Sequence, residues 1–462
     1  MSHFYISAAN KSSGKTTMSI GLCAALTNKG YQVQPFKKGP DYIDPIWLSQ
    51  ATGRACHNLD FNTQTRDEIL YTYGHYSQDA DVCLIEGNKG LFDGMDLHGS
   101  DCNAAMAKQL QAPVIMVLDT RGTIRGVAPL LLGYQAFDNE LDIAGVILNQ
   151  VGGSRHEGKL RAVIEEYTNI PVLGAVHRNP AMNIDERHLG LMPGNEDKQA
   201  LNKIAELGRL IDEQVDLEAL MNIANSAAEI VSTHKPVEIQ SGKPVRIGIA
   251  RDVSFGFYYP GDLEAMSDAG AELIEIDTLH DAELPKLDGL FIGGGFPETQ
   301  MTKLTANVSL RNSIKDAIEA GLPTYAECGG LMYLSRAIVW QGEKHEMVGI
   351  IPADAVMYDR PQGRGYIRLR PTDDYPWPLQ ESHSISAHEF HYSRLEGLEG
   401  EFDYAYKVER GTGIDGEHDG LCYKNLMACY AHMRNTEAHT WALNFVTFVR
   451  HCKRHASNAT TM

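Results

Sequence analysis

One feature restricts the fold more than any other: near the start of the chain, an apolar run is followed by a Gly-Lys-Thr turn. The run HFYIS (residues 3–7) is typical of a buried strand, and the loop that follows ends in Gly14, Lys15 and Thr16. A stretch with apolar residues at helical spacing comes next. This order of strand, loop and helix places backbone N–H groups and a helix N-terminus around a phosphate. This feature therefore predicts an α/β unit that binds a nucleotide.

The loop departs from the usual G-x4-G-K-[ST] pattern at one position, because Ala9 occupies the place of the first glycine. Alanine is the least costly replacement where the backbone avoids positive φ, so we expect the loop to bind ATP. Lys15 is expected at the β- and γ-phosphates, and the Thr16 hydroxyl on Mg²⁺. Asn149, at the end of a later strand, is a candidate contact for the base. Phosphate contacts are expected from Ser12, Ser13, Gly14, Lys15, Thr16 and Thr17.

The first part of the chain alternates apolar runs with helical stretches. Continuous β-branched and aromatic runs are typical of strands buried on both faces. Six of them occur: HFYIS, YQVQPF, DVCLIE, PVIMVLD, IAGVILN and PVLGAV. This βαβ order predicts a mostly parallel sheet between helices, in a domain that covers residues 1–195.

The alternation stops after residue 195. Residues 196–244 combine helical spacing with a polar stretch that carries two prolines, and we interpret them as a helical segment and a linker. A second α/β unit begins at VRIGIARD and is expected to cover residues 245–452. A chain of 462 residues is too long for one compact core, which agrees with at least two domains.

Charge and composition disfavour several classes of protein. The 41 basic and 60 acidic side chains give a formal charge of −19, which disfavours a nucleic-acid or anionic-membrane surface. No secretory signal is visible, and no apolar run approaches the ~20 residues of a membrane span. Eight cysteines without a C-x-x-C pair indicate reduced thiols. We therefore expect a cytoplasmic protein.

Two further motifs place acids after predicted strands. PFKKGPDYIDP carries Asp41 and Asp44, and LIEGNKGLFDG carries Glu86 at a strand end. Ligands of open parallel sheets bind outside the carboxyl ends of the strands, so both motifs are expected to converge with the phosphate loop. Mg²⁺ prefers few carboxylates together with phosphate oxygens and water. The predicted metal set is Thr16, Asp41 and Glu86.

Cys328 lies in PTYAECGGLMYL, where a strand runs through two glycines into a helix. A nucleophile on such a turn is accessible, and the helix N-terminus favours its thiolate. The N–H groups of Gly329 and of the turn FIGGGFPE are candidates for an oxyanion hole. His432, in ACYAHM, is the candidate base.

The motifs, taken in order, resemble those of the cobyrinic acid a,c-diamide synthase family, glutamine-dependent amidases of tetrapyrrole carboxylates. The resemblance covers nearly the whole chain: SSGKTT, PFKKGPDYIDP, LIEGNKGLFDG, GVILNQVGGSRH, ERHLGLMP, GGGFPE, ECGGLMYL, HEFHYS and a late YAH. It implies an N-terminal P-loop domain similar to dethiobiotin synthetase. It also implies a C-terminal class I-like glutamine amidotransferase domain of α/β fold.

The resemblance implies a reaction as well. The a and c carboxylates of a corrinoid precursor, cobyrinate or hydrogenobyrinate, would be activated by ATP as acyl phosphates and amidated with ammonia from glutamine, in cobalamin biosynthesis. Cys328 would be the glutaminase nucleophile and His432 its base, with Gly294, Gly295 and Gly329 at the oxyanion hole. The residues near the activated carboxylate would be Lys37, Tyr42, Asp44 and Asp93, and Asp41 and Glu86 would bind Mg²⁺.

Two departures from related proteins stand out. Glutaminases of the wider class carry a carboxylate two residues after the base, where this chain has Arg434. The family generally lacks that acid, and Glu389 in HEFHYS is a candidate to orient His432. Asn10 occupies the place of the signature lysine of partition-type ATPases, so no lysine acting in trans is expected.

Two other functions remain open from the residues alone. Relatives of the family amidate sirohaem or another sirohydrochlorin-type tetrapyrrole, and the motifs concern activation and ammonia supply, which all of these enzymes share. A partitioning-type ATPase scaffold would use the phosphate loop but not the glycine-flanked Cys328. The resemblance leaves a homodimer open.

Overall fold

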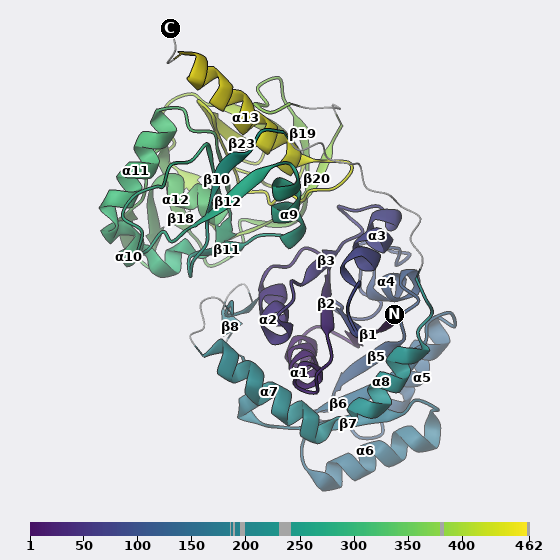
Figure 1. Ribbon diagram of the computed structural model, residues 1–462. Coiled ribbons are helices and arrows are strands. Elements are labelled where there is room, and N and C mark those ends of the chain that lie inside the picture. Colours follow the sequence, from purple (N-terminus) through teal and green to yellow (C-terminus); the bar gives the residue numbers. More distant parts are fainter. Residues whose placement is uncertain (185, 188–189, 195–198, 231–241, 379–382, 460–462) are drawn as a thin grey trace. The chain divides into compact units, whose positions relative to one another are not determined.

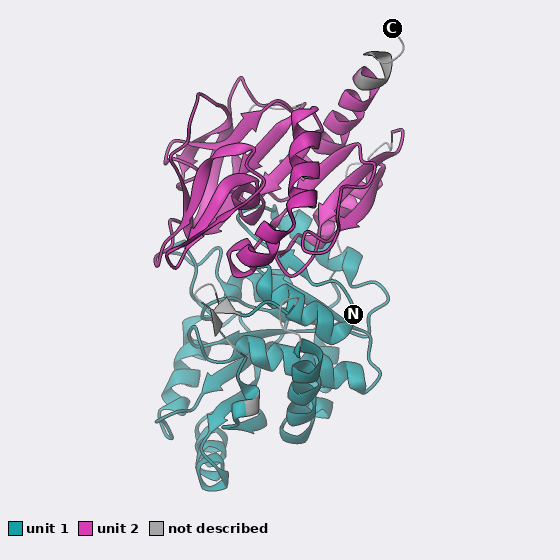
Figure 2. Cartoon of the chain, turned by 90° about the vertical axis from the view of Figure 1, so that its left-hand side faces the viewer, with its two compact units in different colours: residues 1–235 teal, residues 236–462 magenta. Residues whose placement is uncertain are grey.

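The computed structural model describes residues 1–184, 186–187, 190–194, 199–230, 242–378 and 383–459. They form two compact units, Met1–Lys235 and Pro236–Met462 (Figure 2). Each unit is α/β and has its own central sheet, which confirms the predicted fold class. The motif at 186–193 and the predicted helical segment and linker at 196–244 lie partly outside the described residues. Every helix within the described ranges is too short or too polar to span a lipid bilayer.

The first unit has a sheet of seven parallel strands in the order β3-β2-β4-β1-β5-β6-β7 (Figure 1). Six strands coincide with the six predicted runs: β1 (Ser2–Ala8), β2 (Val33–Lys38), β4 (Val82–Glu86), β5 (Val114–Asp119), β6 (Ile143–Val151) and β7 (Val172–His177). The seventh strand, β3 (His57–Leu59), lies at the edge of the sheet and was not predicted.

Helices cover both faces of this sheet. In β1, Phe4 and Ile6 belong to one buried cluster and Tyr5 to the other, as the alternation of a strand requires. The first face packs against α1 (Lys15–Asn28), α2 (Ile43–Thr52), α7 (Ala200–Gln214) and α8 (Leu217–Ser226). The second face packs against α3 (Arg66–Tyr76), α4 (Asn103–Gln109), α5 (Val127–Phe137) and α6 (Ser154–Tyr167). The helices of the segment 196–244 therefore pack on the first unit's sheet. A short antiparallel pair, β8 (Glu186–Arg187) and β9 (Gly190–Leu191), follows β7.

The second unit has a nine-stranded mixed sheet. Its parallel part contains, in order, β12 (Ala271–Ile276), β10 (Val245–Ala250), β13 (Gly289–Ile292), β15 (Thr324–Glu327) and β24 (Leu426–Cys429). The sheet continues through antiparallel pairings with β23 (His418–Tyr423), β22 (Asp403–Arg410), β19 (Gly363–Pro371) and β20 (Ile385–His391).

Two further layers complete the second unit. One face of the sheet packs against α9 (Pro260–Asp268) and α13 (Trp441–Ala459). The other packs against α10 (Met301–Ala306), α11 (Val308–Glu319), α12 (Gly329–Leu334) and a small sheet of β17 (Glu343–Glu346), β16 (Ser335–Trp340), β18 (Ile351–Met357) and β21 (Ser393–Glu396). A two-stranded pair, β11 (Phe255–Phe257) and β14 (Gly294–Gly295), lies beside the start of α12.

Candidate functional site

The N-terminus of α1 is open to an anion. Gly14 is the N-cap with a φ of 87°, and Ser12 also has a positive φ of 63°. In the described residues no side chain caps this end, and the first turn carries no acidic residue. The first N–H groups of a helix have no partner within the helix, and the macrodipole is positive there. The N-terminus of α1 can therefore bind a phosphate, as the loop sequence predicts.

Asn149, at the end of β6, supports this loop. Its Nδ2 donates a hydrogen bond of 2.9 Å to the carbonyl of Ser13, and its Oδ1 accepts one from the N–H of Gln150 at 2.9 Å. A Cβ at Gly14 would lie 2.2 Å from the same Nδ2, so a larger residue would displace the amide. Both ends of the Asn149 side chain are thus engaged with the protein, and a contact with the nucleotide base stays a prediction.

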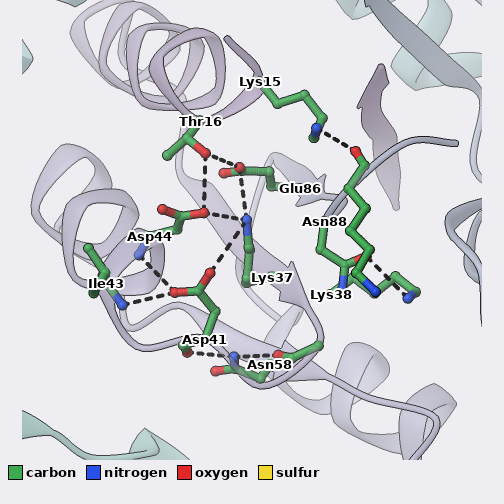
Figure 3. A network of polar contacts seen from close by, with 12 residues as sticks. Lys15, Thr16, Lys37, Lys38, Asp41, Ile43, Asp44, Asn58, Glu86 and Asn88 are labelled. Carbon is green, nitrogen blue, oxygen red and sulfur yellow. Dashed lines mark hydrogen bonds and ion pairs between the residues drawn. The ribbon is translucent and has the colours of Figure 1, made fainter. Parts of the chain in front are cut away.

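A buried polar network joins the phosphate loop to the acids of β4 and α2 (Figure 3). The Thr16 hydroxyl lies 2.7 Å from Glu86 Oε1 and 3.1 Å from Asp44 Oδ2. Lys37 Nζ donates to the same two carboxylates, at 2.9 Å and 2.5 Å. Lys37 and Glu86 are paired residues of the parallel neighbours β2 and β4, which explains why their side chains meet. The motifs expected to converge do so at the carboxyl ends of these strands.

Asp41, predicted as a ligand of Mg²⁺, lies at the start of α2. Its Oδ1 accepts the N–H groups of Ile43 and Asp44 at 2.9 and 3.2 Å and so holds the first turn of α2, while its Oδ2 lies 4.0 Å from Lys37 Nζ. Among the described residues, the carboxylates that contact the Thr16 hydroxyl are Glu86 and Asp44. Tyr42 occupies the N-cap position of α2 and is buried.

The charges of this network favour a bound cation. Burial raises the pKa of Glu86, although Lys37 opposes the shift. Burial alone would lower the pKa of Lys37, but the carboxylates of Asp44 and Glu86 hold it well above its ordinary value. In the described part of the chain, Glu86 Oε2 is buried without a hydrogen-bond partner. An unpaired carboxylate oxygen next to a hydroxyl and a phosphate loop is the kind of partner that Mg²⁺ finds in nucleotide sites.

The turn after β4 reaches the loop lysine. Burial, reinforced by the charge of Lys37, lowers the pKa of Lys15 to about 8, and its Nζ donates to the carbonyl of Lys89 at 2.5 Å. Asn103, which the sequence analysis missed, holds this turn by donating to the carbonyl of Gly90 at 2.6 Å. Asp93 accepts the N–H of Gly90 at 3.1 Å and so stays in the same turn. No sequence signal identifies Asn103, because it lies on the helix after the turn.

Cys328 occupies a strained turn between β15 and α12. Its φ of 46° is unusual for a residue other than glycine, and its N–H donates to the carbonyl of Cys429 at 2.7 Å. A Cβ at Gly330 would lie 2.1 Å from the carbonyl of Ile292, so the turn requires glycine there. Strained backbone of this kind occurs at nucleophile turns. Cys328 is 7% exposed.

The predicted oxyanion residues approach both the base and the nucleophile turn. A Cβ at Gly294 would lie 2.5 Å from His432 Cε1, and one at Gly329 would lie 2.9 Å from the N–H nitrogen of Gly295. Tyr258 fixes the preceding residue, because its hydroxyl accepts the N–H of Gly293 at 2.9 Å. The glycines therefore bring together three segments that the sequence predicted separately.

His432 follows β24 and is 3% exposed. Its imidazole stacks on that of His388 with ring centroids 4.9 Å apart, and its Nδ1 lies 3.5 Å from Glu327 Oε2. Burial alone would lower the pKa of His432. A hydrogen bond with Cys328, the charge of Cys328 and the neighbouring Glu327 outweigh burial and raise this pKa to about 10. Cys328 and His432 thus form an interacting pair.

Glu389 does not have the predicted role of orienting this imidazole. Its two oxygens accept the N–H groups of Thr412 and Gly413 at 2.7 and 2.9 Å, and the imidazole next to it is that of His391, at 3.6 Å. In the described part of the chain, Glu327 places a carboxylate oxygen 3.5 Å from His432 Nδ1, and no motif of the sequence predicts this contact.

Comparison with known protein families gives one match for each unit. Residues 6–191 match the CobQ/CobB/MinD/ParA nucleotide binding domain, and residues 246–439 match the CobB/CobQ-like glutamine amidotransferase domain. A solved glutamine amidotransferase is 15% identical, with a TM-score of 0.33, and the alignment covers 45% of this chain and 98% of that one.

Curated relatives match along nearly the whole chain. The cobyrinate a,c-diamide synthase of Magnetococcus marinus is 46% identical over 452 residues, which cover 96% of this chain and 97% of the relative. The enzyme of the same name from Methanosarcina acetivorans is 41% identical, with 93% and 91% covered. That of Archaeoglobus fulgidus is 40% identical, with 96% of each chain covered.

Proposed function

The chain belongs to the cobyrinate a,c-diamide synthase family of glutamine-hydrolysing carbon–nitrogen ligases, and from this premise we propose that it amidates the a and c carboxylates of a corrinoid precursor, cobyrinate or hydrogenobyrinate, in cobalamin biosynthesis. One observation carries the proposal. A single chain holds a phosphate loop with adjoining acids and, in its other unit, a thiol paired with an imidazole. The first site suits the activation of an acid by ATP, and the second suits the release of ammonia from glutamine.

Activation comes first because a carboxylate is a poor acyl donor, whose leaving group would be oxide. In the proposed step, a carboxylate oxygen of the substrate attacks the γ-phosphorus of ATP, the bond to ADP breaks, and an acyl phosphate forms. The N–H groups of residues 12–17 and the ammonium of Lys15 bind the phosphates and neutralise charge that develops on them. Ammonia then attacks the acyl carbon, and inorganic phosphate leaves.

When bound, Mg²⁺ would supply positive charge that offsets the negative charge of the phosphates. Within the described residues, no three His, Cys, Asp or Glu side chains converge as a metal site of their own, which agrees with a metal that relies on phosphate. The proposed ligands are Thr16 and Glu86, and Asp44 replaces Asp41 of the sequence prediction because it contacts the Thr16 hydroxyl. Asp41 then serves to hold the start of α2.

The substrate carboxylate is proposed to bind beside this network. Lys37 is buried among carboxylates and keeps its charge, so it can attract the anionic acid while Asp44 is engaged by the metal. Tyr42 and Asp93 lie on the two turns that flank the network, and we assign them to the same pocket.

The second site is proposed to hydrolyse glutamine. The Cys328 thiol gives its proton to His432, and the thiolate attacks the amide carbon of glutamine. The N–H groups contributed by Gly294, Gly295 and Gly329 stabilise the oxyanion. When the C–N bond breaks, His432 returns the proton to the leaving ammonia, and water then hydrolyses the thioester to glutamate. Ammonia is mostly protonated near neutral pH, so release of the neutral amine inside the enzyme favours amidation.

Isotope transfer tests the acyl phosphate directly. Cobyrinate labelled with ¹⁸O in its carboxylates is incubated with ATP, Mg²⁺ and glutamine, and the inorganic phosphate is analysed by mass spectrometry. One ¹⁸O per amide formed is expected in phosphate, because the carboxylate oxygen leaves with phosphorus. Unlabelled phosphate would contradict the mechanism. Sirohaem in parallel reactions tests the substrate: faster amidation of sirohaem would replace cobyrinate in the proposal.

A further inference from the structure

Glu327 is a buried carboxylate directly before the proposed nucleophile, at the end of β15. Its Oε1 accepts a hydrogen bond of 2.7 Å from the Tyr325 hydroxyl and one of 2.9 Å from the N–H of Met433. Its Oε2 lies 3.5 Å from His432 Nδ1. Two hydrogen bonds therefore hold Oε1 in place, and Oε2 faces the imidazole.

Two other buried acids hold the segment that carries the imidazole, and they act on its backbone. Asp419 accepts the N–H groups of Tyr430 and Ala431, each at 2.9 Å, and Asp262 accepts that of Asn435 at 2.9 Å. Both acids thus hold the backbone on either side of His432. The acid that reaches the ring comes from β15, the strand paired in parallel with β24.

An imidazole that accepts a proton from a thiol needs a partner for its other nitrogen. That partner keeps the proton on Nδ1, so that Nε2 is free to act as the base. The position two residues after His432 cannot supply it, because the guanidinium of Arg434 has donors and no acceptor. The neighbouring His388, stacked on the ring, has a pKa well below its ordinary value because of burial and the charge of His432, so it stays neutral and adds no charge beside the imidazole.

We propose that Glu327 is the positioning residue of the glutaminase site: its carboxylate accepts the Nδ1–H of His432 and holds Nε2 toward the Cys328 thiol. The distance of 3.5 Å is longer than a hydrogen bond, and catalytic hydrogen bonds of ligand-free sites commonly shorten in the substrate complex. During the reaction the thiol proton moves to Nε2, and the Glu327 side chain stays beside Nδ1 of the resulting imidazolium. The inference rests on the proposed glutaminase function of this unit.

The test compares Glu327→Gln, Glu327→Asp and Tyr325→Phe in the full-length protein, with glutamine hydrolysis and ammonia-driven amidation measured separately. The glutamine side chain keeps an oxygen for Met433 but removes the charge. We expect Glu327→Gln to lower kcat for glutamine by about 10²- to 10⁴-fold with little change in KM, as loss of an imidazole-orienting carboxylate does elsewhere. The alkaline limb of its pH–rate profile should move to lower pH, because the imidazolium loses a neighbouring anion.

The controls separate positioning from folding. Tyr325→Phe removes a donor to the same carboxylate but keeps its charge, so its pH profile should match that of the unmodified protein. Glu327→Asp should have a higher kcat than Glu327→Gln, and its alkaline limb should lie closer in pH to that of the unmodified protein. Ammonia-driven amidation should persist in all three variants. If Glu327→Gln fails to fold, Glu327→Asp decides, because a shorter acid should still lower kcat and shift the limb.

A glutaminase kcat within about two-fold of the unmodified protein, with an unchanged pH profile, in the folded Glu327 variant would overturn the inference. That result would leave the proposed function intact. If the unmodified protein did not hydrolyse glutamine, that result would instead exclude the proposed function itself.

Discussion

Thr16 and Glu86 lie 70 positions apart in the chain and meet at 2.7 Å between the threonine hydroxyl and Glu86 Oε1. The contact follows from the sheet order, since β4 lies between β1 and β2 and the three strands end at the same edge. Lys37 closes the network from β2 (Figure 3). A hydroxyl of the phosphate loop and a buried acid thus face one position, where the proposed Mg²⁺ would bind.

The Thr16 hydroxyl is the first part of this arrangement to test. Thr16→Val keeps the shape but removes the oxygen, and we expect amidation to fall by about 10²- to 10³-fold, as for loss of one transition-state contact. The requirement for Mg²⁺ should rise. Thr16→Ser is the matched control, because it restores the hydroxyl and should recover most of the activity. Magnesium titrations of all three proteins measure the effect, and equal magnesium requirements in Val and Ser variants would exclude the assigned ligand.

Lys15 is expected to act before ammonia is needed. Lys15→Ala should lower amidation by at least about 10²-fold with glutamine and with ammonium salts alike, because phosphate charge is no longer neutralised. Lys29→Ala is the control at the other end of α1, where the lysine is exposed and pairs with Asp212. It should behave as the unmodified protein does. Product retained by Lys15→Ala with ammonium salts would contradict the assigned role of the loop.

Gly294 tests the geometry of the second site. In Gly294→Ala the added methyl group would lie 2.5 Å from His432 Cε1, so the imidazole is displaced from its present position. Glutamine-driven amidation should fall by about 10²-fold or more, the effect of misplacing a catalytic group. Ammonia-driven amidation in the same variant is the internal control and should be unchanged. Equal losses with both nitrogen sources would mean that the substitution disturbs more than this site.

Asp262 links the stability of the second unit to pH. Its oxygens accept the N–H of Asn435 and the indole N–H of Trp441, each at 2.9 Å. Burial raises its pKa from 3.8 to about 7, although the N–H of Asn435 opposes the shift. The folded protein therefore keeps the proton up to about pH 7, whereas the unfolded chain releases it near pH 4. The stabilising contribution of this group is complete below pH 4 and is lost as the pH rises to 7.

Asp262→Asn removes this dependence, because an amide does not ionise. Relative to the unmodified protein, the variant should gain stability between pH 5 and pH 8, by about 1.4 kcal/mol for each pH unit below the raised pKa. Urea denaturation at both pH values, followed by the fluorescence of Trp441 and the other tryptophans, measures the gain. Parallel stability curves for the two proteins would show that Asp262 is ionised in the folded state throughout this range.

Much of the first unit's architecture could be predicted because its strands are long and apolar. The missed strand, β3, has only three residues, His57–Leu59, and two of them are polar. The convergence of Thr16 with Glu86 was also predictable, since carboxyl ends of parallel strands share one edge. Which of Asp41 and Asp44 contacts the Thr16 hydroxyl was not predictable. The answer depends on which of the two carboxylates accepts the N–H groups of the first turn of α2.

The second site was harder to predict in its details. Cys328 and its glycines form a local pattern, so the sequence identifies the turn. Glu327 lies beside this pattern, but its significance depends on His432, 105 residues later, and on the parallel pairing of β15 with β24. The motif HEFHYS favours Glu389 as the acid beside His432, whereas its oxygens accept the backbone N–H groups of Thr412 and Gly413. Local sequence does not reveal such contacts between distant strands.

We propose that a thiol in one unit supplies the ammonia that is joined to an ATP-activated acid in the other, and the nitrogen source that Cys328→Ala can still use decides this point. Amide formation is measured with cobyrinate, ATP and Mg²⁺, once with glutamine and once with ammonium chloride at alkaline pH. We expect the variant to lose glutamine-driven amidation and to keep an ammonia-driven rate within about two-fold of that of the unmodified protein. Amidation from glutamine at an undiminished rate, or loss of both reactions in a folded variant, would contradict the proposal.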